Sequence, residues 1–141
     1  MTVRNDVVLW DNGEDRLSLF SVPPEQQYKY IEGKPCVTFG LSYENKNYKG
    51  CDIFTVFDRF YTELIDEMEK TLRSLRGGFR IEDKGADTDG YVDFEMANGK
   101  LTANGQLGAS FSGYSLRFAA EADQTLVGAL LQSLAVCGES K

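Results

Sequence analysis

The chain contains no histidine, and this absence removes several classes of active site. A Ser-His-Asp triad, a Cys-His pair and a zinc site with histidine ligands all need an imidazole ring. Catalysis by carboxylate, lysine or tyrosine side chains stays formally open. Asp93 and Glu95 form a carboxylate pair, but a glycoside hydrolase needs its pair at a set separation inside a cleft lined by aromatic rings. We therefore predict that the chain is not an enzyme and carries no cofactor.

Clusters of basic residues are also missing. Lysine and arginine total 15 against 22 aspartates and glutamates, so the net charge is −7 and the pI is about 4.6. A nucleic-acid backbone is bound through gathered lysine and arginine side chains. The composition therefore predicts no nucleic-acid partner and favours a basic protein as the partner.

Long apolar runs and cysteine pairs are absent as well. The first residues, MTVRNDVVLWDNG, have no long apolar stretch after Arg4, so we expect neither a signal peptide, a membrane span nor a membrane partner. The three cysteines, Cys36, Cys51 and Cys137, form no CxxC pair, which favours reduced thiols in a cytoplasmic protein. The 141 residues suffice for one domain that buries a core without metals or disulfides.

The segment from Phe57 to Leu75 has the clearest periodicity in the chain. Its apolar residues recur at the i, i+3, i+4, i+7 spacing of an amphipathic helix. We expect Thr55 to cap its start, with Asp58 three residues later as in a capping box. The glycines at 77 and 78 are expected to end it.

A second helix is predicted near the end of the chain, capped by Asp123 and closed by Gly138. Its apolar stripe comprises Leu126, Val127, Leu130, Leu131, Leu134 and Cys137. Alternating runs separated by turn residues predict strands before each helix. They lie at 7–10, 16–22, 36–43 and 48–55 before the first helix, and from 79 and at 91–96, 101–107 and 116–120 before the second. In the run 16–22 two registers are open, with either Leu17 and Leu19 or Phe20 and Val22 facing inward. Asn98-Gly99 is a strong hairpin signal.

The predicted elements follow the order of four strands and a helix, twice over. The units are residues 1–76 and 77–141 of a single domain, 1–141, and their mutual sequence identity is negligible. Strand runs that each end in a helix favour an α+β fold, an antiparallel sheet with the two helices packed on it. A similar double order of strands and helix occurs in the Whirly fold, which we give as an analogy.

Acidic residues concentrate between residues 82 and 95, where six acids stand against a single lysine. These candidate partner-binding residues are Glu82, Asp83, Asp87, Asp89, Asp93 and Glu95. The fragment 87–90, Asp-Thr-Asp-Gly, resembles the middle of an EF-hand loop, but the first and last ligand positions fall on Gly85 and Met96. We therefore predict no metal site. The segment is either a solvated turn or an acidic patch that meets a basic partner.

Aromatic residues are frequent in the first half of the chain. They include Trp10, Tyr28, Tyr30, Tyr43 and Tyr48. Core packing and loop anchoring explain most of them, and any that are exposed are candidates for an interface, because tyrosine and tryptophan are common anchors there.

Two stretches resemble a known family. They are Gly90-Tyr91-Val92-Asp93-Phe94-Glu95-Met96, and Leu116-Arg117-Phe118 followed by Asp123-Gln124-Thr125-Leu126. With the acidity and length, they resemble small bacterial immunity proteins of the WapI-like, contact-dependent inhibition type, in element order over about residues 36 to 137. The resemblance implies a cytoplasmic protein that occludes the active site of a basic toxin domain, often a nuclease, in a one-to-one complex. The alternative is a non-catalytic small-ligand-binding or assembly module.

Overall fold

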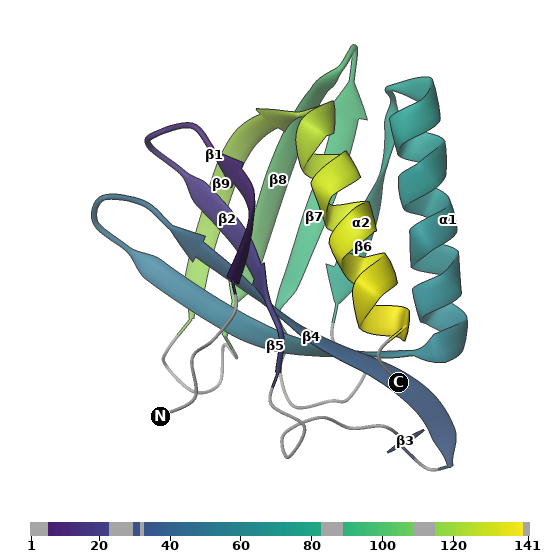
Figure 1. Ribbon diagram of the computed structural model, residues 1–141. Helices are drawn as coiled ribbons and strands as arrows, with labels where there is room; N and C mark the ends of the chain where they lie inside the picture. The colour runs from purple at the N-terminus through teal and green to yellow at the C-terminus, as the bar shows by residue number, and fades with distance from the viewer. Residues whose placement is uncertain (1–5, 23–29, 32, 83–88, 109–114, 140–141) are drawn as a thin grey trace.

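Two antiparallel sheets, each followed by a helix, make up the fold (Figure 1). The structure is a computed structural model that describes residues 6–22, 30–31, 33–82, 89–108 and 115–139. The predicted α+β class and the Whirly-like order of elements are confirmed. One short strand, β3 (Tyr30–Ile31), was not among the predicted strands.

The first sheet is built around β4 (Lys34–Glu44). One edge of β4 pairs with β5 (Lys49–Phe57) from end to end, because a tight turn joins the two strands. β4 also pairs with β2 (Arg16–Phe20) over its second half and with β3 at its start. β1 (Asp6–Asp11) then pairs with β2 at the border of the sheet.

The two registers left open for residues 16–22 turn out to be compatible. Leu17 and Leu19 join the main core, as one alternative predicted. Phe20 and Val22 are also buried, outside that core cluster. The ring of Phe20 lies where a side chain on Gly40 would be, so the glycine leaves room for it.

The second sheet is a simple meander. Its strands follow in the order β6 (Gly77–Glu82), β7 (Tyr91–Ala97), β8 (Lys100–Leu107) and β9 (Leu116–Asp123). The predicted hairpin at residues 98 and 99 joins β7 to β8. Both of its residues have positive φ, 53° and 80°, as a tight two-residue hairpin turn requires.

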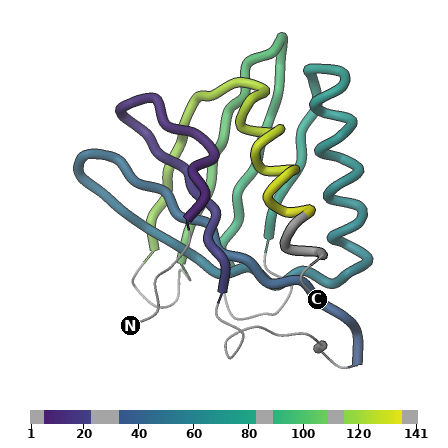
Figure 2. The backbone as a smooth tube through the Cα atoms, viewed as in Figure 1, coloured from purple at the N-terminus to yellow at the C-terminus, as the bar shows by residue number. Residues whose placement is uncertain are grey.

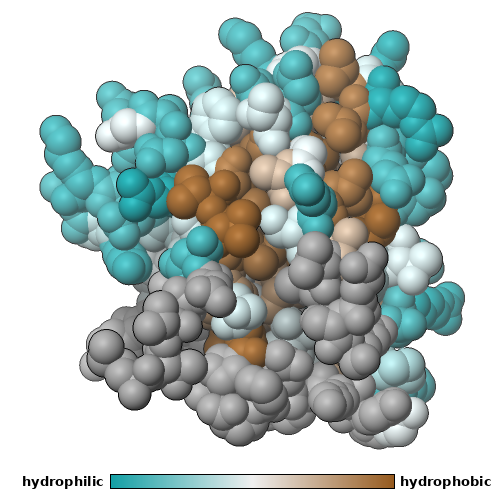
Figure 3. Space-filling view, viewed as in Figure 1, coloured by the Kyte–Doolittle hydropathy of each residue, from teal (hydrophilic) through white to brown (hydrophobic). Residues whose placement is uncertain are grey.

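The two helices, α1 (Asp58–Ser74) and α2 (Gln124–Glu139), lie side by side in Figures 1 and 2. The hydroxyl of Tyr61 on α1 donates a hydrogen bond to the carbonyl of Leu134 on α2, which ties the pair together. Apolar side chains gather over α2 and its borders in Figure 3. No helix in the described ranges is long and apolar enough to cross a membrane.

One continuous core joins both sheets and both helices. Its fully buried members include Phe39 and Phe54 from the first sheet, Phe94 from the second, and Met68 from α1. α2 contributes Leu126, Val127, Leu130 and Leu134 of its predicted stripe. The side chain of Cys137, also assigned to that stripe, lies outside the part that the structure describes. Each fully buried aliphatic or aromatic side chain stabilises the fold by about 1.5–3 kcal/mol.

The start of α1 differs from the prediction. The N-cap is Phe57, in an extended conformation (φ −62°, ψ 144°), and no side chain caps the helix. Thr55 is buried within β5, and its hydroxyl lies 3.3 Å from that of Thr38 on β4. The predicted capping box is therefore wrong, because β5 runs directly into the helix and keeps Thr55 in the sheet.

The other helix ends are set by local geometry. Leu75 ends α1 in the left-handed region (φ 55°), and its N–H donates to the carbonyl of Thr71 at 2.9 Å. Residues 77 and 78, predicted to stop the helix, already belong to β6. Asp123 caps α2 as predicted, since its Oδ1 accepts a hydrogen bond from the N–H of Thr125 at 2.9 Å. Gly138 lies inside α2 and does not end it.

Candidate binding surface

The face of the second sheet that points away from the core is polar. Burial alternates along its strands, so that every second side chain faces outward. This outer face, which we call the polar sheet face, carries Arg80, Glu82, Tyr91, Asp93, Glu95, Thr102, Asn104, Gln106, Arg117 and Glu121. The strand register sets Glu82, Tyr91, Gln106 and Arg117 in one row across all four strands.

Arg80 is the centre of the interactions on this face. Its guanidinium forms a two-pronged ion pair with Asp93, with Nε–Oδ1 at 2.8 Å and Nη2–Oδ2 at 3.1 Å. A looser ion pair reaches Glu82 at 3.7 Å. The same guanidinium lies over the ring of Tyr91, 4.4 Å from its centroid. The hydrogen bond with Asp93 raises the pKa of Arg80, so the group keeps its charge at any physiological pH.

One end of the polar sheet face is tied to the first sheet. Gln106 belongs to this face but is buried, and its Nε2 donates to Asp89 Oδ1 at 3.1 Å and to the carbonyl of Gly108 at 3.2 Å. The N–H of Gly108 in turn donates to Asp52 on β5 at 2.8 Å. Gly90 is required beside this junction, because a side chain on it would overlap the carboxylate of Asp52.

The predicted acidic site is therefore brought together only in part. Glu82, Asp93 and Glu95 lie on the polar sheet face, and two of these three share Arg80 as a partner. Asp89 holds Gln106 at the end of the sheet. Asp83 and Asp87 lie outside the described residues. The role of these acids in binding a partner stays a prediction.

The sequence-based prediction missed the cationic and aromatic side of this surface. Arg80, Tyr91 and Arg117 are far apart along the chain, and the register of antiparallel strands sets them on one face. The period-two alternation of the strands could have revealed their shared orientation. The alternation does not show which side chains pair with one another, because pairing depends on which residues face each other across neighbouring strands.

The aromatic residues of the first half divide as expected between packing and exposure. Tyr43 is buried and stacks on Phe118 of the second sheet, with ring centroids 4.5 Å apart. Trp10 is partly buried against the core. Tyr48 is 63% exposed in the hairpin between β4 and β5. The side chains of Tyr28 and Tyr30 lie outside the described part of the chain.

Cysteines and acids form no further site within the described ranges. Cys36 is buried, with its Sγ 3.4 Å from the carbonyl oxygen of Lys34, and Cys51 is exposed. No group of three or more cysteine, aspartate or glutamate side chains in these ranges is placed to hold a metal ion. The EF-hand-like fragment falls largely in residues 83–88, which the structure does not describe.

Comparison with solved structures shows the fold type. WHY1 from Arabidopsis thaliana superposes with a TM-score of 0.53 and 11% identity, covering 96% of this chain and 89% of that chain. The plant transcriptional regulator PBF-2 superposes with a TM-score of 0.48 and 10% identity, covering 96% of this chain and 81% of that chain. No family model and no curated protein matches the sequence. At these identities the likeness concerns the fold.

These comparisons correct three predictions. The chain was expected to be an immunity protein, to bind a basic toxin domain and to have no nucleic-acid partner. The solved structure that supports the fold type is that of WHY1, and this finding overturns these expectations, so the predictions about function and partner are wrong. The physical error lay in counting acids without their partners, since Arg80 pairs with both Asp93 and Glu82. The resemblance to WapI-like proteins itself stays a prediction, and the likeness that the comparisons support is one of fold, to WHY1.

Proposed function

We propose that this chain binds single-stranded nucleic acid on the polar sheet face, without catalysing a reaction. The observation that carries the proposal is the stacked pair of Arg80 and Tyr91 on an outward-facing sheet surface. Single-stranded bases bind proteins by stacking on aromatic rings and on arginine guanidinium planes. The compartment that we propose remains the cytoplasm, because the three cysteines of the chain include no CxxC pair.

The neighbouring side chains suit a single-stranded nucleic acid that runs across the sheet. Arg117 lies in the same row as Tyr91 but two strands away, about 10 Å at the usual strand spacing. It is exposed and can meet a phosphate. On the strand between them Gln106 occupies the same row but is buried, and Asn104, two residues away along β8, offers an exposed side-chain amide that can bond a base edge. A nucleotide chain on this face would thus find a stacking site, an amide and a cation on the three successive strands β7, β8 and β9.

The charge of the chain favours single strands over duplexes. A duplex hides the faces of its bases and presents phosphates, and a chain with a net charge of −7 repels them. A single strand offers base faces, and stacking contributes about 1–3 kcal/mol per base. Because few phosphates would be neutralised, the affinity should depend weakly on salt. Each neutralised phosphate contributes a slope of about −0.7 in the plot of log affinity against log salt concentration.

The proposal predicts that Tyr91→Ala weakens binding of a fluorescein-labelled dT20 oligonucleotide about five- to a hundredfold, the equivalent of one stacked base. Fluorescence anisotropy at low salt measures the affinity. Tyr48→Ala is the matched control, because it also removes an exposed tyrosine but lies in the hairpin of the first sheet. Its affinity should equal that of the wild type.

A second variant separates stacking from charge. Arg117→Ala should weaken binding and reduce the salt slope by about 0.7, since it removes one phosphate contact. Tyr91→Ala should leave that slope unchanged. Absence of binding by the wild-type chain at low salt, or equal losses for Tyr91→Ala and Tyr48→Ala, would show that the polar sheet face is not a nucleic-acid site.

A further inference from the structure

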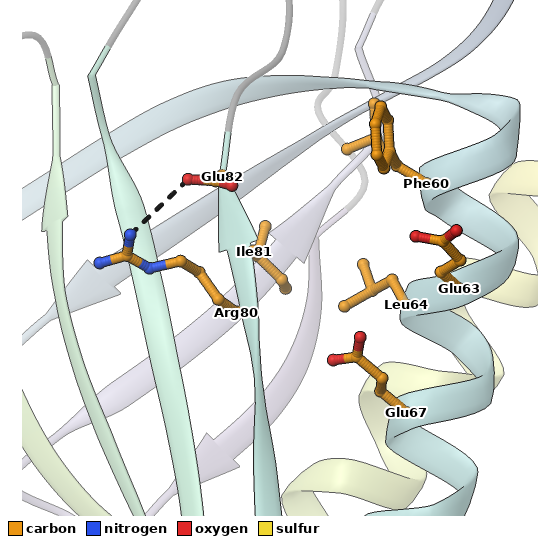
Figure 4. A pocket seen from close by; sticks show the side chains of 8 residues that line it. Phe60, Glu63, Leu64, Glu67, Arg80, Ile81 and Glu82 are labelled. Atoms are coloured by element: carbon orange, nitrogen blue, oxygen red, sulfur yellow. Dashed lines mark ion pairs between the residues drawn. The ribbon is translucent and has the colours of Figure 1, made fainter.

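A groove runs between α1 and the edge strand β6, and it shares only Arg80 and Glu82 with the polar sheet face (Figure 4). Its volume is about 280 Å³, close to the lower size limit of small-molecule sites. Leu64 from α1 and Ile81 from β6 point toward each other across it, with Val56 of β5 also in the lining. The ring of Phe60 lies at one end and is 39% exposed. The floor of the groove is therefore apolar.

Carboxylates border this apolar floor on both sides. Glu63 and Glu67 extend from α1 toward β6, and Glu82 stands on β6 itself (Figure 4). Glu63 meets Arg59 at 3.8 Å, and Glu82 meets Arg80 at 3.7 Å, both as exposed and therefore weak pairs. Glu67 makes no ion pair within the described ranges. The lining thus holds three carboxylates against the one cation Arg80, and it favours a cationic occupant.

An apolar floor with acidic borders selects the chemistry of that occupant. A hydrated metal ion gains nothing from Leu64 and Ile81, and these carboxylates do not converge as a metal site. A chain of methylene groups can lie on the floor while ammonium groups at its ends meet the carboxylates, as the stem and head of a lysine do on protein surfaces. The exposed ring of Phe60 lies under the guanidinium of Arg59, 5.9 Å from its centroid, which shows that this ring attracts a cation at the end of the groove.

The spacing of the acids indicates the length of the ligand. Glu63 and Glu67 are four residues apart on one face of α1, which places their backbones about 6 Å apart along the helix axis. A span of three or four methylene groups between two ammonium groups is of this size. We propose that the groove binds a linear aliphatic polyamine, of the class of putrescine and spermidine, along α1. The proposal does not depend on nucleic-acid binding by the polar sheet face.

The test measures spermidine and putrescine binding to the full chain by isothermal titration calorimetry at fixed ionic strength. Glu63→Gln combined with Glu67→Gln should weaken spermidine binding about tenfold or more, because two charge contacts are lost. The matched control is Asp66→Asn combined with Glu69→Gln. It removes the same charge from α1, but neither residue lines the groove. Circular dichroism of both double variants checks that α1 is intact.

Four results would overturn the proposal. They are no heat of binding with spermidine, equal weakening by the two double variants, equal affinity for putrescine and for a monoamine such as propylamine, or tighter binding of a lysine-containing peptide than of spermidine. Equal weakening would mean diffuse attraction to an acidic protein. Tighter binding of the peptide would mean that the groove binds a lysine side chain of a protein and not a free polyamine. Phe60→Ala should also weaken spermidine binding, which charge alone does not predict.

Discussion

At the scale of single residues, Tyr43 shows how one side chain joins both halves of the molecule. It belongs to β4, is almost fully buried, and stacks on Phe118 of β9. Its hydroxyl donates a hydrogen bond to Asp15 and accepts one from Asn45 at 3.2 Å. The ring therefore packs between the sheets while the hydroxyl holds two hairpin loops together.

We expect Tyr43→Phe to lower the free energy of unfolding by about 1 kcal/mol, because the stacked ring stays and the hydrogen bonds are lost. The variant should also change how the free energy of unfolding depends on pH in the alkaline range. Burial, aided by Asp15, raises the pKa of Tyr43 above its usual value of 10.0. Its contribution is thus complete below pH 10.0 and is lost as the pH rises through the raised pKa. Urea unfolding between pH 7 and 11 measures both effects.

The control for this prediction is Tyr48→Phe, which removes an exposed hydroxyl from the same hairpin. It should change neither the free energy of unfolding at pH 7 nor its dependence on pH in the alkaline range. If the two variants behave alike, the contacts of the Tyr43 hydroxyl do not stabilise the fold.

At the scale of elements, the two helices begin in different ways. α1 has no side-chain cap and depends on packing of its apolar face. α2 starts at a carboxylate, since Asp123 accepts hydrogen bonds from both the N–H and the hydroxyl of Thr125, at 2.9 and 2.6 Å. These bonds lower the pKa of Asp123. Stability should therefore depend on this residue at the start of α2 and not on Thr55.

Asp123→Ala is expected to lower the free energy of unfolding by about 0.5–2 kcal/mol at pH 7, the usual cost of losing a helix cap. Because the folded pKa lies below 3.8, the contribution of Asp123 is present above pH 3.8 and is lost as the pH falls through the lowered pKa. The difference between wild type and Asp123→Ala should thus shrink in acid. Chemical unfolding at pH 7 and pH 3 checks this.

Asp123→Asn supplies the matching control, since asparagine caps helices but does not titrate. It should keep most of the stability at pH 7 and should not show the acid loss of the wild-type cap. A constant difference between wild type and Asp123→Ala across this pH range would contradict the role of the carboxylate charge.

At the scale of the whole molecule, the two units of strands and helix share one core. Phe39, Met68 and Phe94, from the first sheet, α1 and the second sheet, belong to the same buried cluster. The hydrogen bond from Gly108 to Asp52 and the stack of Tyr43 on Phe118 also cross between the units. Among the residues that the structure describes, the buried cluster thus spans both units.

This shared core predicts a single cooperative unfolding transition for residues 1–141, in keeping with the predicted single domain. Trp10, the one tryptophan of the chain, reports on the first sheet, and far-ultraviolet circular dichroism reports on all elements. Urea transitions followed by the two signals should coincide. Met68→Ala should shift both midpoints together by the equivalent of about 2–5 kcal/mol. Separate transitions would mean that the units fold independently.

The sequence by itself determined the elements and the inward faces of most of them. Helix and strand periodicities act over a few residues, so the stripe on α2 and the alternation Val37, Phe39, Leu41 are visible without a structure. The hairpin at Asn98-Gly99 is local for the same reason. Local reasoning erred at Thr55, where the continuous passage from strand to helix overrode a capping pattern.

Only the tertiary structure decided which side chains meet. The net charge of −7 counts acids but not their partners, and the ion pair of Arg80 with Asp93 depends on the register of β6 against β7. The stacking of Arg80 on Tyr91 depends on the same register, and the groove depends on the packing of α1 against β6. Contacts between segments distant in the chain are set by pairing and packing of whole elements, so short sequence patterns do not contain them.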